Sequence, residues 1–279
     1  MTFFMAILLG IVQGVAEFLP ISSSGHLTLM QHFFSGMEEP DSLYNILLHF
    51  ATLIAVCVVY RKDIMEMIRE FFLGVAALFA KTGSRETPPP PARRLVLLVV
   101  LGTLPLFLVL PIEDRVEQLG NSPLFVALAL VVTGFLLFFS DRMAKGRKTE
   151  RSARVSDALL VGLAQACATV PGLSRSGCTI AAGMALGFER KFAVRYSFLL
   201  SLPAVVGATI LKVLNVLQDG GVDMERLPMY LAGMVVAGVV GYFSIKLVNL
   251  LASKGKFGKF AYYCWAAGLV SFVATLLTH

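Results

Sequence analysis

Two polar side chains near the amino terminus lie inside an otherwise apolar segment. Gln13 and Glu17 are four residues apart, so on a helix they share one face. A carboxylate in such a segment is costly to bury without a partner, which makes Glu17 a candidate functional group. The alternative is a neutral, hydrogen-bonding role in packing. The carboxylate and the neighbouring amide oxygen together could hold Mg²⁺, a cation that prefers oxygen ligands.

A serine-rich turn follows in the same segment. Pro20 ends a helix, and the residues after it can begin another, which leaves hydroxyls and free N–H groups at a helix amino terminus. Such a terminus favours anions. His26 titrates near neutral pH in water and therefore suits proton transfer. The candidates at this first break are Ser22, Ser23, Ser24, Gly25 and His26.

A second break of the same kind occurs in a later apolar segment, where Pro171 and Gly172 stop a helix. Arg175 follows, and its planar, permanently charged fork suits phosphate oxygens. An arginine at this place needs an anionic partner. Pairing with Glu17 for structure alone is the alternative, and it too would bring the two breaks into contact. The candidates at the second break are Ser174, Arg175, Ser176 and Gly177.

Together the two breaks contain the parts that phosphoryl transfer requires. Positive charge stabilises the nonbridging oxygens, a hydroxyl or an aligned water attacks phosphorus, and an acid or base moves the proton. A site at this depth in an apolar chain implies a substrate with a lipid tail. The residues alone therefore indicate a phosphate site for phosphoryl transfer on a substrate with a lipid tail.

Composition indicates what must position these breaks. Hydrophobic residues make up 57% of the 279 residues and charged residues only 15%, and the mean hydropathy is +0.77. That balance is far from the usual soluble one, and apolar runs of about the length that crosses a bilayer recur. We therefore expect an all-α polytopic membrane protein. The expected crossings are residues 44–60, 95–111, 124–140, 196–214, 229–250 and 260–277.

Loop charges predict the orientation of these crossings. The net charge of +6 resides in short loops between apolar runs, which is typical of cytoplasmic membrane loops and excludes nucleic acid as a partner. The basic loops are 61–62, 81–94, 141–157, 190–195 and 254–259, and the acidic residues expected outside are Glu38, Glu39, Asp41, Glu113, Asp114, Glu117, Asp219, Asp223 and Glu225. Both termini then lie outside. Residues 64–80 start and end at basic loops, so they should lie on the cytoplasmic face or re-enter, and the proline-rich stretch 87–94 should be a linker.

The two interrupted segments, 3–34 and 155–189, must each begin and end on one side, so both are expected to be re-entrant helix pairs. An offset of 152 residues pairs Gly10 with Gly162, Gln13 with Gln165, Ser22 with Ser174, Ser24 with Ser176 and Gly25 with Gly177. Accidental identity is the alternative, but the loop charges also give the two segments opposite orientations. We therefore expect an inverted-topology repeat within one membrane domain, 1–279, with a site at the midplane. Halves 1–140 and 156–279, each a re-entrant pair plus three transmembrane helices, flank a cytoplasmic linker at 141–155.

These motifs resemble the undecaprenyl-diphosphatase family, also called the bacitracin-resistance protein family. Its first signature matches Gln13 to His26, and its second, Pro-Gly-x-Ser-Arg-Ser-Gly, matches residues 171–177 without departure. The resemblance covers essentially the whole chain. It implies a hydrolase of the bacterial plasma (inner) membrane that converts undecaprenyl diphosphate to the monophosphate. Such an enzyme recycles the lipid carrier for peptidoglycan synthesis and confers bacitracin resistance.

The resemblance also implies residue roles. Glu17 would position metal or substrate with Gln13 beside it, Ser23 would be the candidate nucleophile, His26 its base or acid, and Arg175 the phosphate clamp, supported by Ser174 and Ser176. It implies dependence on Mg²⁺ or Ca²⁺. Many members carry Glu at the position of Gln13, so here Glu17 is the one carboxylate expected at the metal. The sequence does not choose between Ser23 and His26 as the nucleophile.

Two further questions stay open at this point. Inverted repeats with broken helices are also the architecture of transporters, so a polyprenyl-phosphate flippase, alone or in addition to the phosphatase, is the alternative function. The small residues in 233–241 suit close helix packing, either within one chain or between chains of an oligomer in the surrounding lipid.

Overall fold

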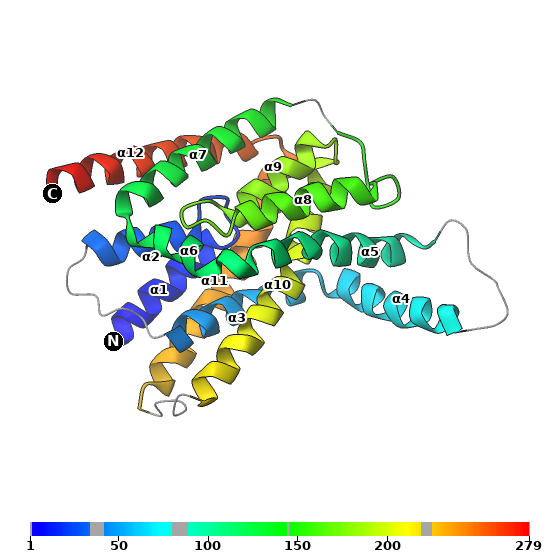
Figure 1. Ribbon diagram of the computed structural model, residues 1–279, viewed down its shortest axis with the longest axis horizontal. Coiled ribbons are helices and arrows are strands. Elements are labelled where there is room, and N and C mark those ends of the chain that lie inside the picture. The colour runs from blue at the N-terminus through cyan, green and yellow to red at the C-terminus, as the bar shows by residue number, and fades with distance from the viewer. Residues whose placement is uncertain (1, 34–41, 80–88, 144–145, 219–224, 279) are drawn as a thin grey trace.

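The computed structural model describes residues 2–33, 42–79, 89–143, 146–218 and 225–278, and these are almost entirely helical (Figure 1). One isolated bridge joins Lys148 to Phe188. The helices are α1 (Phe3–Ala16), α2 (Ser23–Phe33), α3 (Ser42–Val59), α4 (Arg61–Phe79), α5 (Pro91–Thr103), α6 (Glu113–Gln118), α7 (Pro123–Arg142), α8 (Val155–Cys167), α9 (Arg175–Ala185), α10 (Arg190–Gln218), α11 (Leu227–Ser253) and α12 (Phe260–Thr278), with 3₁₀ turns η1 (Leu104–Leu108), η2 (Leu110–Ile112), η3 (Leu119–Asn121) and η4 (Phe257–Lys259).

Five helical stretches within the described residues are long and apolar enough to cross a membrane, and the bent pair α3 and α4 makes a sixth candidate. Three of these candidates precede the 141–155 linker and three follow it, which agrees with the expected number in each half. The prediction of an all-α polytopic membrane protein is confirmed. α4 turns by 86° from α3, so it does not continue the α3 crossing, as expected for residues 64–80.

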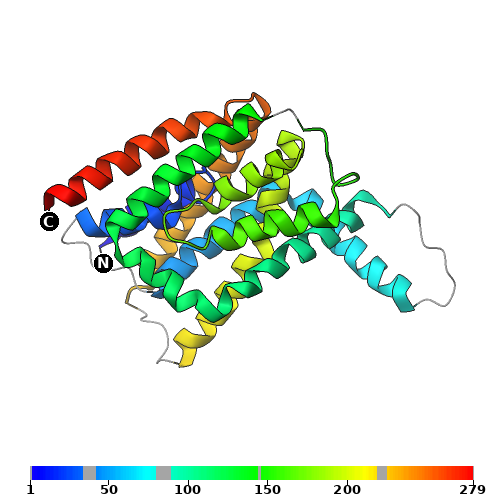
Figure 2. The ribbon, with the colours of Figure 1, turned by 45° about the horizontal axis from the view of Figure 1, so that its top comes forward.

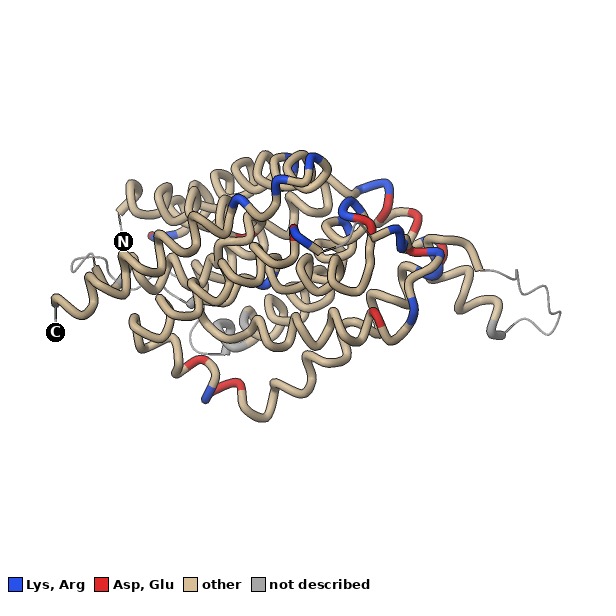
Figure 3. Tube along the Cα trace, turned by 90° about the horizontal axis from the view of Figure 1, so that it is seen from above, with Lys and Arg blue, Asp and Glu red and all other residues tan. Residues whose placement is uncertain are grey.

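The outer surface is apolar, and its charges are unevenly placed. Large exposed hydrophobic side chains include Phe4, Val235, Val270 and Leu277, as lipid contact requires. Lys, Arg, Asp and Glu gather mostly toward the end of the molecule away from the two chain termini (Figure 3). The start of α1 and the end of α12 both lie toward the opposite end (Figure 1). This distribution suits a chain whose loops meet water at two separate faces.

The two segments predicted to re-enter are built from short helices. α1 has 14 residues and α8 has 13, whereas a helix needs about 20 to cross a bilayer. Each is followed by a turn and an 11-residue helix, α2 or α9. These lengths match helices that stop partway through a membrane.

The contacts of the two short helices correspond. Gly10 of α1 lies against the backbone of Gly233 in α11, and Gly162 of α8 lies against the backbone of Gly102 in α5. α7 packs along α12, as Figures 1 and 2 show, and α3 packs against α10. These are the contacts that two related halves would make. They support the inverted repeat, which stays a prediction.

The structure answers the question left open by the small residues of 233–241. Gly233 faces the Tyr44 side chain and the Ala6 carbonyl, and Gly241 faces the ring of Phe18. On the other side of this contact, Gly14 faces the Ala237 carbonyl. The stripe therefore packs α11 against α1 and α3 within one chain.

Some expected boundaries differ from the structure. α5 begins at Pro91, inside the stretch predicted to be a linker up to residue 94, because proline is well tolerated in the first turn of a helix. The crossing expected to end at 111 instead continues through 3₁₀ turns into the short helix α6. Residues 81–88 of the linker, and the acidic residues Glu38, Glu39, Asp41, Asp219 and Asp223, lie outside the described residues.

Candidate active site

The first break is a tight turn between α1 and α2. Ser22 has a φ of 69°, a left-handed conformation that is uncommon for residues other than glycine. Its hydroxyl oxygen accepts a hydrogen bond from the Gly25 N–H at 3.1 Å, which caps the start of α2. The Ser24 hydroxyl lies 3.3 Å from the same oxygen. The serines predicted to ring a helix start therefore do so.

The second break repeats this pattern between α8 and α9. The Ser174 hydroxyl oxygen accepts from the Gly177 N–H at 3.1 Å, and the Ser176 hydroxyl lies 3.2 Å from it. Here Gly172 takes the left-handed conformation, with a φ of 92°. Thr133 of α7 supports the turn, because its hydroxyl oxygen accepts from the Ser174 N–H at 3.2 Å.

The two breaks lie directly against each other. A methyl group at Gly25 would be 3.1 Å from the Cα of Gly172, and one at Gly177 would be 3.4 Å from the Cβ of Pro20. Each helix start therefore faces the opposite turn, with little room for a side chain at Gly25. This contact joins segments about 150 residues apart in the sequence into one polar centre within the apolar protein.

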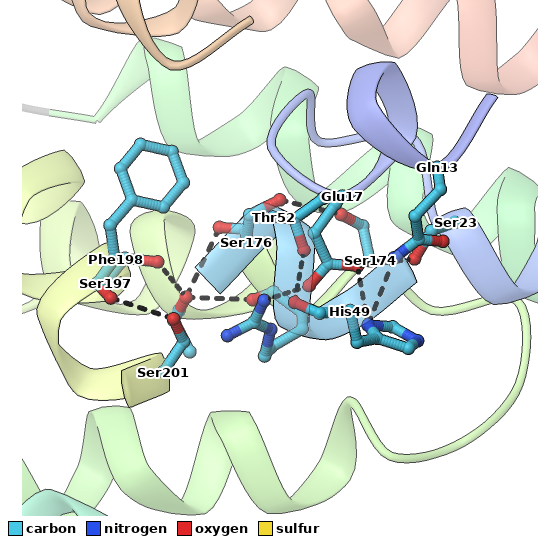
Figure 4. A network of polar contacts seen from close by, with 12 residues as sticks. Gln13, Glu17, Ser23, His49, Thr52, Ser174, Ser176, Ser197, Phe198 and Ser201 are labelled. Atoms are coloured by element: carbon cyan, nitrogen blue, oxygen red, sulfur yellow. Dashed lines mark hydrogen bonds and ion pairs between the residues drawn. The ribbon is translucent and has the colours of Figure 1, made fainter. Parts of the chain in front are cut away.

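Glu17 is the hub of that centre (Figure 4). It is buried, and Arg175 from the second break forms an ion pair with its Oε1 atom. Ser23 donates a hydrogen bond to Oε2 at 2.9 Å, and the Gln13 amide donates to the same oxygen at 3.0 Å. Four of the side chains predicted from the sequence thus converge: an acid, an amide, a hydroxyl and a guanidinium.

His49 of α3 also belongs to the cluster, and the sequence analysis did not single it out. Its Nδ1 lies 3.0 Å from the Gln13 amide nitrogen and 3.5 Å from the Glu17 carboxylate. The available signal was a lone histidine within the apolar run 44–60, which was interpreted as an ordinary crossing. A titratable group is costly in an apolar segment, and this holds for His49 as it does for Glu17.

His26 lies apart from the Glu17 cluster. Its Nδ1 is 2.8 Å from the Ser22 carbonyl oxygen, and its Nε2 is 2.7 Å from the hydroxyl of Tyr263 in α12, on which the ring also stacks. Both ring nitrogens are therefore engaged in holding the first turn against α12. Its predicted role as acid or base stays a prediction.

A cavity of about 520 Å³ opens beside the cluster. Its polar wall includes Glu17, His49 and Arg175, whereas α10 supplies an apolar wall with Ala204 and Val205 among its residues. Ser24 also lines it, while Ser22, Ser174 and Ser176 are buried within the turns. The cavity can therefore accept a molecule with a charged group at one end and a hydrocarbon chain at the other.

The residues fit a divalent cation only as part of a larger ligand set. Gln13 Oε1 is buried and has no hydrogen-bond partner among the described residues, so it is a free oxygen next to the Glu17 carboxylate. Within those residues, no group of three or more His, Cys, Asp or Glu side chains could hold a metal by itself. Mg²⁺ commonly binds one or two carboxylates together with substrate phosphates. The site suits a cation that arrives with a phosphate ligand.

Comparison with known proteins decides the family. Residues 6–270 match the family described as bacitracin resistance protein BacA. The chain belongs to the BacA family. Proteins named undecaprenyl-diphosphatase align with this BacA-family chain almost from end to end, so both breaks lie inside the matched region. That of Alkaliphilus metalliredigens is 39% identical and covers 99% of this chain and 100% of the relative. That of Syntrophotalea carbinolica is 40% identical over 96% and 97%, and that of Methanosphaera stadtmanae is 37% identical over 98% of each.

Proposed function

We propose that this protein hydrolyses undecaprenyl diphosphate to undecaprenyl phosphate and inorganic phosphate. The observation that carries the proposal is the Glu17 cluster, in which Arg175 and Ser23 contact the two oxygens of one carboxylate where two broken helices meet. A guanidinium for phosphate, a hydroxyl for attack and a carboxylate to take its proton are the parts of a phosphoryl-transfer site. The identity of the substrate comes from the relatives, which carry the name undecaprenyl-diphosphatase.

Arg175 couples substrate binding to activation of the carboxylate. In the structure it pairs with Glu17 Oε1. The diphosphate offers the guanidinium a bidentate set of charged oxygens. We expect Arg175 to move from Glu17 to the diphosphate when the substrate binds. That exchange leaves Glu17 with an unshared oxygen and a stronger tendency to accept a proton.

Ser23 is the nucleophile in this mechanism. Its hydroxyl already donates to Glu17 Oε2, so Glu17 takes the proton while the Ser23 oxygen bonds to the terminal phosphorus. The bond from that phosphorus to the bridging oxygen breaks, and undecaprenyl phosphate leaves with the electron pair. Water then hydrolyses the phosphoserine, which releases phosphate and restores the hydroxyl. His26 holds the turn that carries Ser23, through its contacts with Ser22 and Tyr263.

The two helix starts stabilise the charge of the phosphates. α2 and α9 both begin at the site, and unpaired N–H groups at a helix amino terminus carry partial positive charge. Gly25 and Gly177 let each helix start pack against the opposite turn, while Ser22 and Ser174 cap the two starts. Ser24 and Ser176 lie beside the caps; Ser24 also lines the cavity and can reach the diphosphate, whereas the buried Ser176 hydroxyl supports the Ser174 cap.

A divalent cation, Mg²⁺ or Ca²⁺, is part of the proposal. Glu17 and Gln13 Oε1 would hold it together with diphosphate oxygens, as the free amide oxygen suggests. Bound there, the cation would offset part of the negative charge of the diphosphate. We expect a chelator to reduce phosphate release, and added Mg²⁺ or Ca²⁺ to restore it.

The setting of the reaction follows from the same proposal. The protein would lie in the bacterial plasma (inner) membrane with both termini outside, and its product would re-enter peptidoglycan synthesis as the lipid carrier. A cell with abundant enzyme would be less sensitive to bacitracin. The apolar α10 side of the cavity would take the first part of the polyprenyl chain.

Phosphate release from undecaprenyl diphosphate by the purified protein tests the proposal. We expect release by the wild type, loss with chelator, and a phosphoserine at Ser23 under rapid quench. The relatives' names give no support to the flippase alternative. Exchange of labelled undecaprenyl phosphate between vesicle leaflets tests it separately. If the wild type exchanges the lipid between leaflets but releases no phosphate, the protein would be a transporter and the phosphatase proposal would be wrong.

A further inference from the structure

Gln165 is a buried polar side chain that the mechanism above does not use. It lies on α8 two residues before the helix ends, and 2% of its surface is exposed. Neither its Nε2 nor its Oε1 has a hydrogen-bond partner among the described residues. Gln165 nevertheless lines the cavity that also contains Glu17 and Arg175.

An unpaired amide at this place is unfavourable for folding alone. Burying a polar group without its hydrogen bonds costs free energy, and most buried polar groups in proteins are paired. A neighbour on the same wall shows the usual solution, because the Thr169 hydroxyl donates to the Ala166 carbonyl at 2.7 Å. Gln13, which the 152-residue offset pairs with Gln165, spends its amide nitrogen on Glu17 and His49. The Gln165 amide is thus available to form hydrogen bonds with a molecule that binds in the cavity.

We propose that Gln165 binds the diphosphate of the substrate, with its Nε2 donating to a nonbridging phosphate oxygen on the second-half side of the cavity. Arg175 lines the same cavity, so the amide and the guanidinium would share the anion. The inference rests on the proposed function, because the ligand it names is that substrate. The residue is a binding and positioning group, distinct from the Glu17 and Ser23 pair that performs the chemistry.

Gln165→Leu separates binding from folding. Leucine is of similar size and has no polar atoms to leave unpaired, so the variant should keep or raise the melting temperature. Its affinity for a polyprenyl methylenediphosphonate, which cannot be hydrolysed at the bridging position, should fall by about tenfold, as loss of one hydrogen bond to a charged group predicts. A variant that fails to fold, or that binds within twofold of the wild type, overturns the proposal.

Gln165→Glu tests which kind of partner the amide meets. A carboxylate next to the diphosphate would repel it, so this variant should bind the diphosphonate more weakly than Gln165→Leu at any Mg²⁺ concentration. If the amide oxygen instead met a cation, Gln165→Glu would bind at least as well as the wild type and at lower Mg²⁺. Binding by Gln165→Glu that equals or exceeds that of the wild type would therefore overturn the proposed phosphate contact.

The control is Ser140→Ala on α7, a buried residue that is not among those lining the cavity and whose hydroxyl donates to the Leu137 carbonyl of its own helix. It should bind the diphosphonate as the wild type does. Because the diphosphonate is not turned over, the measurement is independent of catalysis. If the wild type binds the diphosphonate but releases no phosphate from the natural substrate, the phosphatase proposal is refuted and the Gln165 contact stands. If the wild type is active and the Gln165 variants bind more weakly while Ser140→Ala does not, the contact is supported in an active enzyme.

Discussion

The first and second breaks have the same local structure, a turn followed by a serine-capped helix start, but their polar side chains make different contacts. At the first, Glu17 is contacted by Gln13, Ser23, His49 and Arg175. At the second, the charged residue is Arg175, which pairs with Glu17, and Gln165 has no hydrogen-bond partner among the described residues. At the first break the Gln13 amide is therefore half paired, through its nitrogen, whereas at the second the whole amide of Gln165 is without a hydrogen-bond partner among the described residues.

This difference indicates a division of labour. A carboxylate and a hydroxyl in hydrogen-bond contact suit proton transfer and attack, so the first break is equipped for the reaction. A guanidinium and a free amide suit recognition of an anion, so the second is equipped for binding. Because Glu17 and Arg175 pair across the junction, neither half makes the site alone. Substitutions at the two breaks should accordingly change different measured quantities.

Among the variants that separate the two breaks, the largest loss of kcat should come from Glu17→Gln, which keeps the shape of the side chain and removes the base. We expect kcat to fall by about 10²–10⁴-fold, the usual contribution of a positioned general base. Diphosphonate affinity measured without a divalent cation should change much less, because Arg175 and Gln165 remain and the metal contact proposed for Glu17 is absent from that measurement. Phosphate release under saturating substrate measures the loss. If Glu17→Gln weakens diphosphonate binding and leaves kcat unchanged, Glu17 would have a role in binding and not in the reaction.

Gln13→Leu should be next, and it contrasts with Gln165→Leu. It removes the donor that joins Glu17 and His49, so the free energy of unfolding should fall by about 1.5–3 kcal/mol, the range for hydrogen bonds to charged groups. Thermal unfolding in the same detergent measures both variants. Equal stability loss at the two positions would show that Gln165 is paired as well as Gln13 is, and would contradict the comparison.

His26→Gln should have an intermediate effect on the first break alone. The imidazole joins the Ser22 carbonyl to Tyr263, so its loss should loosen the turn and reduce kcat by about tenfold, near the value of one net hydrogen bond. Tyr263→Phe should cost less, since only one of the two contacts is lost. Rates measured from pH 5 to 9 check the role. If one limb of the pH profile is absent in His26→Gln but present in Tyr263→Phe, proton transfer would be assigned to His26 instead.

The smallest effect should come from Thr133→Val, which removes support from the second turn. The Ser174 N–H loses its acceptor and the Gly172 carbonyl loses a donor, so unfolding should become easier by about 1 kcal/mol. Binding of the diphosphonate should weaken a few-fold while kcat stays near that of the wild type. A selective loss of kcat would contradict the binding role of this turn. Ser140→Ala is again the matched control.

Much of the architecture could be predicted because a bilayer constrains sequences strongly. Apolar length and loop charge gave the crossings, and prolines in apolar segments gave the two breaks. Glu17 and Arg175 were recognisable because a charge in an apolar segment needs a partner. The sequence also placed serine hydroxyls at both helix starts, but it did not single out Ser22 and Ser174 as the caps that the structure shows.

Other parts depend on tertiary contacts that local patterns do not contain. His26 meets Tyr263 at a separation of 237 residues, and no spacing rule predicts that pair. The left-handed conformation of Ser22 would have been expected of glycine. His49 was hidden because one polar residue scarcely alters an apolar run, and the free amide of Gln165 shows only once its neighbours are in place.

The most direct test measures phosphate release from undecaprenyl diphosphate by the wild type and by Arg175→Ala. The variant lacks the ion pair between Arg175 of the second break and Glu17 of the first. Arg142→Ala serves as the control, because this arginine stacks on Phe138 on the outer part of α7. We predict release by the wild type and by Arg142→Ala, and a fall of about 10³-fold or more in kcat/KM for Arg175→Ala, in the range for loss of a transition-state arginine. Full activity in a folded Arg175→Ala protein would contradict a phosphatase site shared by the two breaks.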